Sequence, residues 1–394
     1  MSKFLSGFDM CKVSLILLLC SLLFSLHTKS DIEKEGLKDK VKTVRETGYS
    51  AQEKFGDIVK IKRDRGFLSG SDSYAIYNKS GNLSEINYYD TEEKLIERIA
   101  YKYDSHEQVT EESHYDSSNK LESIVYYKYA GKNLLVAKEQ YNADGILLGK
   151  EKYEYDSRGY KIESVVYESD ETTVLFRETM AYDDRGNMTM HLQFDDAGEL
   201  RYKEEYNYNK KSKPYERKQY EFDNGLYLKK QTTYNDNGDI ILVQTYNNAG
   251  TAIEKIEHKY DSNGNKLEET LYGQGGAVEN TTMYKHDAKG NILEMSNLTP
   301  DGKVDTKSIV SYDEEGNIAE WSVYNSEGRL NHKNKTIYDK SGNPIEENFF
   351  NLKKNQEFEG TSKYIYDEHN NWTQKVVYQK EVPKYMLERE ITYY

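Results

Sequence analysis

The sequence contains few of the residues that usually hold a compact domain together. Two cysteines and four prolines occur among 394 residues, and aliphatic residues are scarce. Both cysteines, Cys11 and Cys20, lie near the N-terminus. A chain cleaved beyond residue 26 therefore has no disulfide, no thiol nucleophile and no thiolate metal site. Because proline is rare, long strands are uninterrupted, and sheet pairing and packing have to stabilise the fold.

Tyrosine and charged residues take the place of the missing aliphatic residues. There are 37 tyrosines, and 31% of the residues are charged. Disordered segments are equally polar, but they are poor in aromatic and β-branched residues. Tyrosine favours strands and buries its ring while its hydroxyl stays in water. The composition therefore predicts thin sheets with much exposed surface rather than disorder.

The N-terminal 30 residues have the layout of a secretory signal peptide. An apolar run of 14 residues, Val13 to Leu26, follows lysines and precedes a polar stretch. The run is too short to cross a bilayer comfortably and fits a signal-peptide core, with an uncleaved anchor as the alternative. A lipid anchor at Cys20 is a further alternative, but Leu19 stands where lipidation signals have a small residue. We expect a periplasmic, outer-envelope or secreted protein that contacts a membrane only if Cys20 is lipidated.

The net charge argues against partners with many negative charges. The formal net charge is −14, and it becomes −16 when residues 1–30, with three lysines and one aspartate, are removed. An acidic surface of this size repels nucleic acid and anionic lipid, and it keeps a repetitive sheet soluble. The sequence also has no basic patch, no phosphate-binding glycine loop before a helix and no nucleophile elbow.

One pattern repeats along most of the chain and decides the expected architecture. An anchor residue, usually tyrosine, returns at intervals of which nine are 26 residues, one is 27 and one is 28. A second aromatic or aliphatic position follows most anchors by 12 residues. The anchors are Tyr77, Tyr103, Tyr129, Tyr155, Tyr182, Tyr208, Tyr234, Tyr260, His286, Tyr312, Tyr338 and Tyr366.

Each anchor is followed by residues that favour a turn. The segment Tyr-Asp-Ser-Asn-Gly-Asn, from Tyr260 to Asn265, shows the fullest form. The aspartate bonds its own backbone to begin the turn, and Gly264 supplies a positive φ that other residues adopt only at a cost. The segments between turns, about seven and nine residues long, end in an aromatic residue and are typical of strands. One repeat is therefore two strands and two turns.

The chain from Leu83 onward is predicted to be all-β, with about 24 antiparallel strands joined as a meander. A twist of roughly −20° per strand accumulates past a full turn over that number. Open twisted sheets rarely exceed about 10 strands without curling, so we expect a spiral or an open tube. The tyrosines two residues before their anchors are expected to stack as an aromatic ladder. They are Tyr101, Tyr127, Tyr153 and Tyr206.

The pattern divides the chain into four parts. Residues 1–30 are the expected signal peptide, and residues 31–76 are irregular strands expected to cap the array. Residues 77–378 are the repeat array, and residues 379–394 are a C-terminal capping strand. Terminal units of repeat arrays are usually atypical because they protect an open sheet edge.

No group of residues stands out as a metal, cofactor or catalytic site. The turn from Asn235 to Asp239 resembles a calcium loop, but calcium needs six or more oxygens and a distal carboxylate at a spacing that does not recur. The eight histidines are scattered, which argues against zinc. Nothing separates a catalytic glutamate from the many that face solvent. Trp321 and Trp372, the only tryptophans, are the candidate ligand contacts, with packing in irregular parts of the coil as the alternative.

The repeat resembles that of a known family. Tyr-Asp-x-x-Gly-Asn followed by a β-segment ending in another tyrosine is similar to the YD-repeat (RHS-like) proteins of bacterial envelopes, and the paired 12 and 14 spacing is similar to MORN-variant repeats. The likeness covers residues 77–378 and implies an envelope or extracellular β-array that binds, wraps or contacts other surfaces. The large family members end in a separate toxin domain behind a self-cleaving core. Only sixteen residues follow Tyr378 here, so no toxin activity is carried over.

These observations favour a non-enzymatic exported protein that uses a curved β-surface to bind or scaffold an unknown protein or glycan ligand. A carbohydrate-binding module that presents tyrosine and tryptophan is the alternative. A glycan-acting enzyme is a distant third, and two carboxylates about 5–9 Å apart in a deep pocket would favour it.

Overall fold

The computed structural model describes residues 30–64, 71–131, 133–223, 226–351 and 356–394. These residues form one short helix, α2 (Asp31–Lys34), and a single sheet of 27 strands that pair antiparallel, which confirms the predicted all-β meander. The first strands are β1 (Val41–Lys54), β2 (Asp57–Arg63), β3 (Asp72–Tyr77), β4 (Leu83–Tyr89), β5 (Leu95–Tyr103), β6 (Val109–Tyr115), β7 (Leu121–Ala130), β8 (Leu134–Asn142), β9 (Leu147–Tyr155), β10 (Lys161–Tyr167), β11 (Val174–Tyr182), β12 (Met188–Phe194), β13 (Leu200–Tyr208) and β14 (Pro214–Asp223). The remaining strands are β15 (Leu226–Tyr234), β16 (Ile240–Tyr246), β17 (Ala252–Tyr260), β18 (Lys266–Tyr272), β19 (Val278–His286), β20 (Ile292–Leu298), β21 (Val304–Tyr312), β22 (Ile318–Asn325), β23 (Leu330–Tyr338), β24 (Pro344–Asn351), β25 (Gln356–Tyr366), β26 (Trp372–Gln379) and β27 (Val382–Tyr393).

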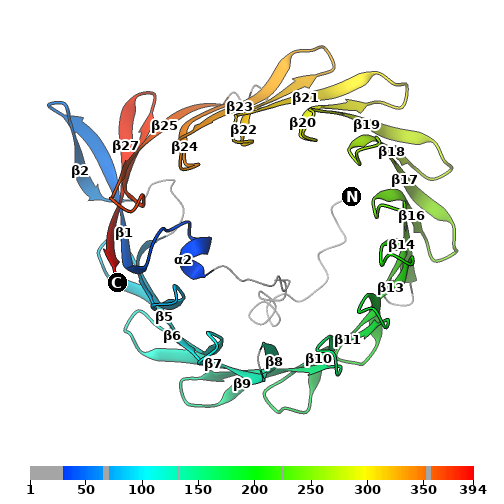
Figure 1. The fold of residues 1–394 in the computed structure, drawn as a ribbon, viewed down its shortest axis with the longest axis horizontal. Coiled ribbons are helices and arrows are strands. Elements are labelled where there is room, and N and C mark those ends of the chain that lie inside the picture. Colours follow the sequence, from blue (N-terminus) through cyan, green and yellow to red (C-terminus); the bar gives the residue numbers. More distant parts are fainter. Residues whose placement is uncertain (1–29, 65–70, 132, 224–225, 352–355) are drawn as a thin grey trace.

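The sheet is closed into a barrel. Val41 to Ser50 of β1 pair with β27, and Thr43 to Glu46 also pair with β3. β1 thus joins the two ends of the meander into a ring of 26 strands (Figure 1). The predicted spiral or open tube is therefore wrong. An open coil would leave two rows of unpaired backbone N–H and C=O groups at its edges, and closure removes both.

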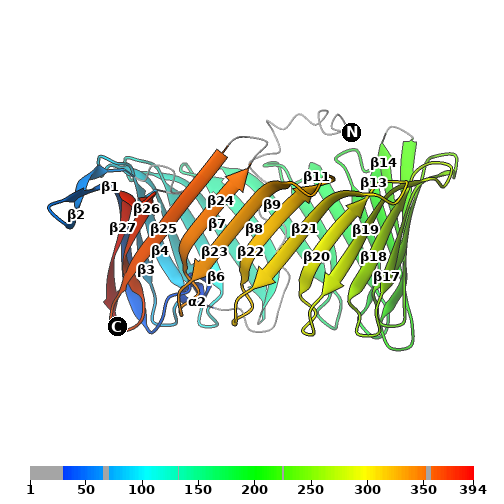
Figure 2. The same ribbon diagram turned by 90° about the horizontal axis from the view of Figure 1, so that it is seen from above.

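Regular bulges bend the sheet evenly. The strands β4 to β27 are the 24 strands predicted from Leu83 onward. Their register shifts at the anchors and at the second aromatic positions, for example at Tyr260 and Tyr272. A bulge bends its strand and increases the local twist. The strands also cross the wall at a slant (Figure 2), which a barrel requires.

The ring is wide enough to leave its centre unfilled by wall side chains. For strands about 4.8 Å apart and tilted by roughly 40°, a barrel of this strand number has a diameter on the order of 50 Å between opposite backbones. The side-chain layer reduces the clear width to about 40 Å, because packed sheets lie about 10 Å apart. The lumen is therefore a space that another molecule can enter.

The two faces of the wall are distinguished by what packs on them. α2 lies inside the ring (Figure 1), where its Ile32 packs with Ala75 and Tyr77. The anchor tyrosines and the residues two before them share this inner face through the strand register. The hairpin of β1 and β2 projects outside the ring, and its Ala51 packs with Val376. That contact marks the outer face.

The predicted turn chemistry is confirmed after Tyr260. Oδ1 of Asp261 accepts hydrogen bonds from the backbone N–H groups of Asn263 and Asn265, at 2.8 and 2.9 Å. Gly264 closes the turn with a φ of +87°, in the left-handed region that the sequence requires of it.

The anchor tyrosines tie each repeat to the one before it. The hydroxyl of Tyr260 donates a hydrogen bond to the carbonyl oxygen of Ile240, at 2.8 Å. The acceptor lies 20 residues earlier, at the start of the preceding strand, β16. The same bond is made by Tyr103, Tyr129, Tyr155, Tyr208 and Tyr312, and by Tyr182 to an acceptor 21 residues earlier.

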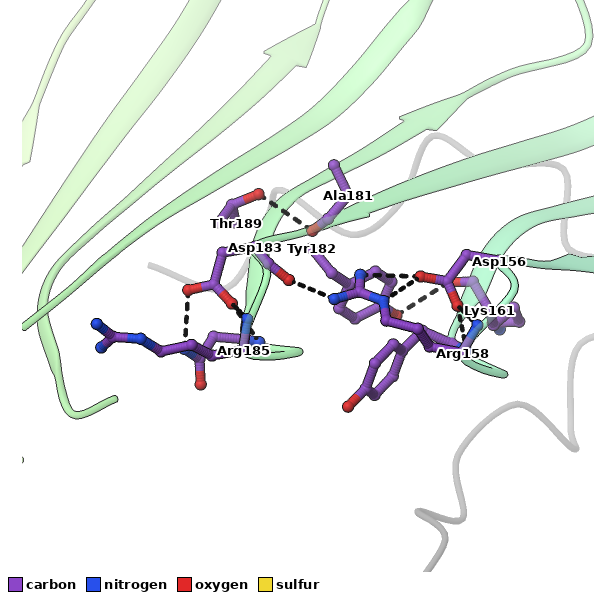
Figure 3. Close-up of polar contacts among 10 residues, drawn as sticks. Asp156, Arg158, Lys161, Ala181, Tyr182, Asp183, Arg185 and Thr189 are labelled. Carbon is purple, nitrogen blue, oxygen red and sulfur yellow. Dashed lines mark hydrogen bonds and ion pairs between the residues drawn. The ribbon is translucent and has the colours of Figure 1, made fainter. Parts of the chain in front are cut away.

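Neighbouring anchor turns also contact one another along one rim of the barrel, which we call the anchor rim. In Figure 3 the guanidinium group of Arg158 pairs with Asp156 in its own turn and donates to the carbonyl oxygen of Asp183 in the next turn, at 2.7 Å. Arg185 donates in the same way to the carbonyl oxygen of Lys210, at 2.8 Å. The turns that follow the second aromatic positions form the opposite rim.

Residues 30–40 complete the anchor rim where the two ends of the sheet meet. The backbone of Lys38 exchanges two hydrogen bonds with the side-chain amide of Asn371, at 2.7 and 3.0 Å. The backbone N–H of Ile32 donates to the carbonyl oxygen of Gly81, at 3.1 Å. This segment therefore lies between the last anchor turn and the first.

The hydrophobic core lies at the seam, which we define as the place where β27, β1 and β3 meet. Two clusters of buried residues pack there, one on each face of the wall. The inner cluster consists of Ile32, Leu37, Val41, Val44, Ala75 and Tyr77, and Val41 is fully buried. The outer cluster consists of Ala51, Val376, Tyr378 and Met386.

Some of the predictions concern parts of the chain outside the described residues. The expected signal peptide lies there, with its apolar run and Cys20, apart from Ser30 at its end. The division into residues 31–76, 77–378 and 379–394 stays a prediction. No helix in the described part of the chain is both long and apolar enough to cross a membrane.

Candidate functional site

The inner face carries a row of charged and aromatic side chains from β5 to β14, which we call the inner polar belt. Successive strands contribute to it at positions that the register places side by side. Its members are Glu97, Glu112, His114, Tyr127, Lys138, Glu151, Tyr153, Lys161, Glu178, His191, Glu204 and Arg217.

At one end of the belt, His114 lies between two glutamates. Its Nε2 is 2.8 Å from Oε1 of Glu112, and its Nδ1 is 3.2 Å from Oε1 of Glu97. The hydroxyl of Tyr127 donates to the other oxygen of Glu112, at 2.8 Å. The bond to Glu112, aided by Glu97, raises the pKa of His114 against the effect of burial, and the same bond lowers the pKa of Glu112. The site therefore favours a protonated imidazole between two carboxylates.

A similar group lies further along the belt, around His191. Its Nε2 is 3.1 Å from Oε2 of Glu178, and its Nδ1 is 4.0 Å from Oε2 of Glu204. Lys161 pairs with Glu178 at 2.9 Å, and Arg217 pairs with Glu204. Burial alone would raise the pKa of Glu178, but the bonds to His191 and Lys161 outweigh it and lower this pKa to about 2. The carboxylate of Glu178 is therefore held ionised by fixed partners.

The tyrosines two residues before the anchors do not form the predicted ladder. They lie on the inner face as expected, but a whole strand separates one from the next, so their backbones are about 10 Å apart. The hydroxyls of two of them bond carboxylates on the inner face instead: Tyr127 donates to Glu112, and Tyr153 donates to Glu151. Burial, as the largest cause, raises the pKa of Tyr127, so its hydroxyl stays a donor.

The inner face from β20 to β23 has a different lining. Its inward positions carry uncharged side chains, for example Val310, Val323 and Asn334. Trp321 lies in this uncharged arc and is 40% exposed. Its ring centroid is 5.0 Å from that of His332, whose ring is in turn 4.9 Å from that of Phe349, on β24. The three rings form an aromatic row beside the lumen.

The second predicted ligand contact, Trp372, also lies on the inner face, at the start of β26. The guanidinium group of Arg389 lies 3.6 Å from its ring centroid, and Tyr364 meets it edge-on at 6.2 Å. Arg389 is held by Glu46, with 2.8 Å between Nε and Oε2. Trp372 is therefore covered by its own neighbours to a greater extent than Trp321. Three strands separate the two tryptophans, roughly 20 Å, so they do not form one site.

Many acidic and histidine side chains of the described wall are paired with other residues and are not gathered around a common point. Within the described ranges, no three histidine, cysteine or acidic side chains are placed to hold a metal ion. The side chain of Asn235 is used inside its own turn, where Oδ1 accepts from the backbone N–H groups of Asn237 and Asp239, both at 2.9 Å. The inner wall is thus equipped for hydrogen bonding, ion pairing and ring stacking.

The sequence did not reveal the inner polar belt, because membership depends on strand register. Glu178 and Glu204 look like the many other glutamates of the chain. Only the pairing of β11 with β12 and of β12 with β13 places His191 between them. A residue an even number of positions before its anchor in the same strand lies on the anchor's face. This rule predicts the inner residues once one contact has shown which face is inside.

Comparisons with known proteins leave the family open. Neither a protein-family model nor a curated protein matches the sequence. The Tc holotoxin pore of Photorhabdus luminescens, with a variant of TccC3, matches 82% of this chain at 12% identity and a TM-score of 0.38, and the match spans 19% of that chain. A porin-like protein from Bacteroides uniformis matches 90% of this chain and 99% of its own length, at 8% identity and a TM-score of 0.22.

Likenesses as distant as these carry no argument about function. This chain spans about a fifth of the length of the Tc component that it matches. The resemblance to YD-repeat (RHS-like) proteins is loosely compatible with these matches and stays a prediction.

Proposed function

We propose that this is an exported, non-enzymatic ring protein that binds a protein or glycan ligand against its inner wall. The observation that carries the proposal is the aromatic row of the uncharged arc: Trp321 is 40% exposed beside the lumen, with His332 and Phe349 next to it. Aromatic side chains supply large contact area at low entropic cost, which is why they dominate binding surfaces.

The size of the lumen supports enclosure of the ligand. A clear width of about 40 Å exceeds the diameter of a small domain, about 30 Å. A ligand inside the ring meets two kinds of wall, the uncharged arc and the inner polar belt. It can therefore be oriented as well as held.

The outer wall supports an aqueous location, in the periplasm or outside the cell. Glu139 on the outer face pairs with Lys128 and Lys150, at 2.7 and 3.0 Å, and these bonds lower its pKa to about 2. Lys255 lies 3.8 Å above the ring centroid of Tyr272 in the same wall. A lysine on the lipid-facing side of a barrel costs about 2–4 kcal/mol at the midplane of a bilayer. This outer wall is therefore suited to water.

Photo-crosslinking from the two faces tests the proposal. Trp321 on the inner face and Tyr126 on the outer face are both aromatic and are 40% and 38% exposed. Each is replaced in turn by p-benzoylphenylalanine, and the native host envelope is irradiated. We expect a heterologous crosslink at position 321 and none at position 126. Crosslinks to a foreign molecule from position 126 alone would show that the ligand surface is the outside.

Carbohydrate binding is the second candidate, and the exposure of Trp321 favours it, because a sugar ring stacks on an open aromatic face. With only two tryptophans, intrinsic fluorescence reports on these positions. We expect chitohexaose, cellohexaose or maltohexaose to shift the emission of the wild type and of Trp372→Phe, but not that of Trp321→Phe. An unchanged emission with all three sugars would leave a protein ligand as the better hypothesis.

A further inference from the structure

The outer wall departs from its repeat pattern in one arc. The residue before each anchor lies on the outer face, near the anchor rim. From Tyr103 to Tyr312 this position is filled by Lys102, Lys128, Glu154, Ala181, Asn207, Thr233, Lys259, Lys285 and Ser311. At the next two repeats it is filled by Ile337 and Ile365, which are 37% and 56% exposed. An isoleucine that leaves this much of its surface in water gains less from burial than a core residue does, and a row of such residues marks a contact surface.

Two further apolar residues extend this arc. Ile309 on β21 and Met283 on β19 are 40% and 38% exposed. The register places them outside: Ile309 lies opposite Glu294, which pairs with the outer residue Lys285 at 3.1 Å. We call Met283, Ile309, Ile337 and Ile365 the outer apolar row. The row crosses β19 to β25 and leads toward the seam.

A hairpin projects from the wall beside the row. β1 and β2 leave the ring beyond Ser50 and extend outward (Figures 1 and 2). One side of the hairpin packs with the wall through Ala51 and Ile58. Ile61 on β2 is 51% exposed, and the tip exposes all of Phe55. The hairpin thus carries apolar side chains that the described part of the chain leaves exposed.

The tip residue is also held in an unfavourable backbone conformation. Phe55 has a φ of +55°. Among the described residues with positive φ, the others are glycine or polar, and Phe55 is the single aromatic one. A left-handed conformation costs about 1–2 kcal/mol for a residue with a side chain, and such strain persists mainly where it serves a function. Glycine would fill this turn without strain.

The hairpin and the row are placed so that two copies can cover each other. The hairpin lies by the rim opposite the anchor rim, since Ser50 pairs with Tyr385 near the start of β27. Ile337 and Ile365 lie by the anchor rim. A two-fold axis perpendicular to the barrel axis inverts one ring relative to the other, and it brings the hairpin of each copy to the isoleucines of its partner. Such an interface is self-complementary, as two-fold symmetry demands.

We infer that this face is a docking surface for a second copy of the chain, with Phe55 of each copy packed on Ile365 and Ile337 of the other. Two convex walls alone touch along a narrow strip, short of the about 800 Å² per partner that a stable interface buries. The projecting hairpins lengthen the contact on both sides. The interface joins two rings with antiparallel axes and leaves both lumens open.

Light scattering after size exclusion, with the purified protein at about 100 µM, tests the inference. The wild type is expected to be a dimer. Ile365→Lys restores the residue type of the regular repeats, and Phe55→Gly relieves the turn, so both variants keep the fold. Each is expected to weaken dimerisation by at least 10-fold. Tyr126→Lys, on the outer face far from the row, is the matched control and leaves the dimer intact.

A mixing experiment tests the pairing itself. Phe55→Lys and Ile365→Glu are each expected to be monomeric alone, but a mixture forms a heterodimer with one new ion pair and one native contact. A monomeric wild type overturns the inference, as does an equal loss with Tyr126→Lys. So does co-sedimentation of a monomeric wild type with phosphatidylglycerol–phosphatidylcholine vesicles that depends on Phe55, because the surface then faces lipid.

Discussion

The seam and the regular wall belong to the same sheet but are held together by different interactions. At the seam, apolar side chains pack on both faces, and Val41 of β1 is fully buried in the cluster that contains Ile32 of α2. In the regular wall a strand buries at most two residues, often polar ones such as Ser113 or Thr270. Backbone pairing, tyrosine hydroxyls and ion pairs hold it instead. The difference shows that the hydrophobic clusters of this protein join the two ends of its sheet.

The comparison also predicts how far the destabilising effect of a substitution should extend around the ring. In a linear array each unit contacts its neighbours, and stability is approximately a sum of local terms. In a closed ring the seam restrains every unit, since opening it creates two free edges at once. A lesion at the seam should therefore be felt around the whole ring, and a lesion in the wall should stay local.

The strongest test replaces Val41 by aspartate. The carboxylate has no partner in the inner seam cluster, and burying it costs about 3–5 kcal/mol. We expect β1 to detach, so that amide hydrogen exchange accelerates in β27 and β3 together. Val243→Asp is the matched control, because Val243 is 7% exposed in the regular wall beside the open lumen. Equal effects of the two substitutions would abolish the distinction between seam and wall.

A turn substitution should have a smaller, local effect. Gly264→Val forces a β-branched residue to a φ of +87°, where the added Cβ meets no other atom within 4 Å. The cost is therefore backbone strain alone, roughly 1–3 kcal/mol. Limited proteolysis should cut near residues 261–265 while β1 and β27 stay protected. Gly264→Asn, which tolerates this conformation, should cost less, and a global loss of protection would contradict the local picture.

One repeat of the wall lacks its tyrosine hydroxyl, and restoring it should stabilise the ring. Nδ1 of His286 is buried without a hydrogen-bond partner in the described part of the structure. His286→Tyr should donate to the carbonyl oxygen of Lys266, 20 residues earlier, and add about 0.5–1.5 kcal/mol to the free energy of unfolding. Tyr260→Phe is the reciprocal control and should remove a similar amount. Chemical denaturation measures both, and a destabilising His286→Tyr would mean that the site is shaped for imidazole.

The smallest expected effect is a pH dependence at His114. Its pKa is raised in the folded protein, so its contribution is fully present below the unfolded pKa of about 6.5 and is lost as the pH rises through the folded value. His114→Gln should therefore lower the melting temperature more at about pH 5.5 than at about pH 9, by the equivalent of about 0.5–1 kcal/mol. A difference that grows with pH would mean that the neutral imidazole is the bound form.

Local features of the fold could be predicted, and features that depend on distant pairing could not. The turn after Tyr260 and the strand count follow from residues within one repeat. Closure depends on the pairing of β1 with β27, whose residues lie more than 300 positions apart in sequence. The sequence of residues 41–54 does not indicate that β27 is their partner. The carboxylates around His191 could not be predicted for the same reason, because they come from different strands. The predicted stacking of tyrosines was wrong because the strand between each pair was not taken into account.

Because the ends of the sheet meet, the ring has no topological beginning. The backbone N–H of Tyr394 donates to the carbonyl oxygen of Lys40, at 3.0 Å, so the C-terminus lies beside the start of β1. A linker from Tyr394 to residue 30 would make the described part of the chain circular with α2 kept, and the ring could then be cut at an exposed turn with every strand pair retained. Circular permutants opened at residues 261–265 should build the same barrel from a different first strand. The order in which the strands are synthesised is then separable from the order in which they stand around the ring.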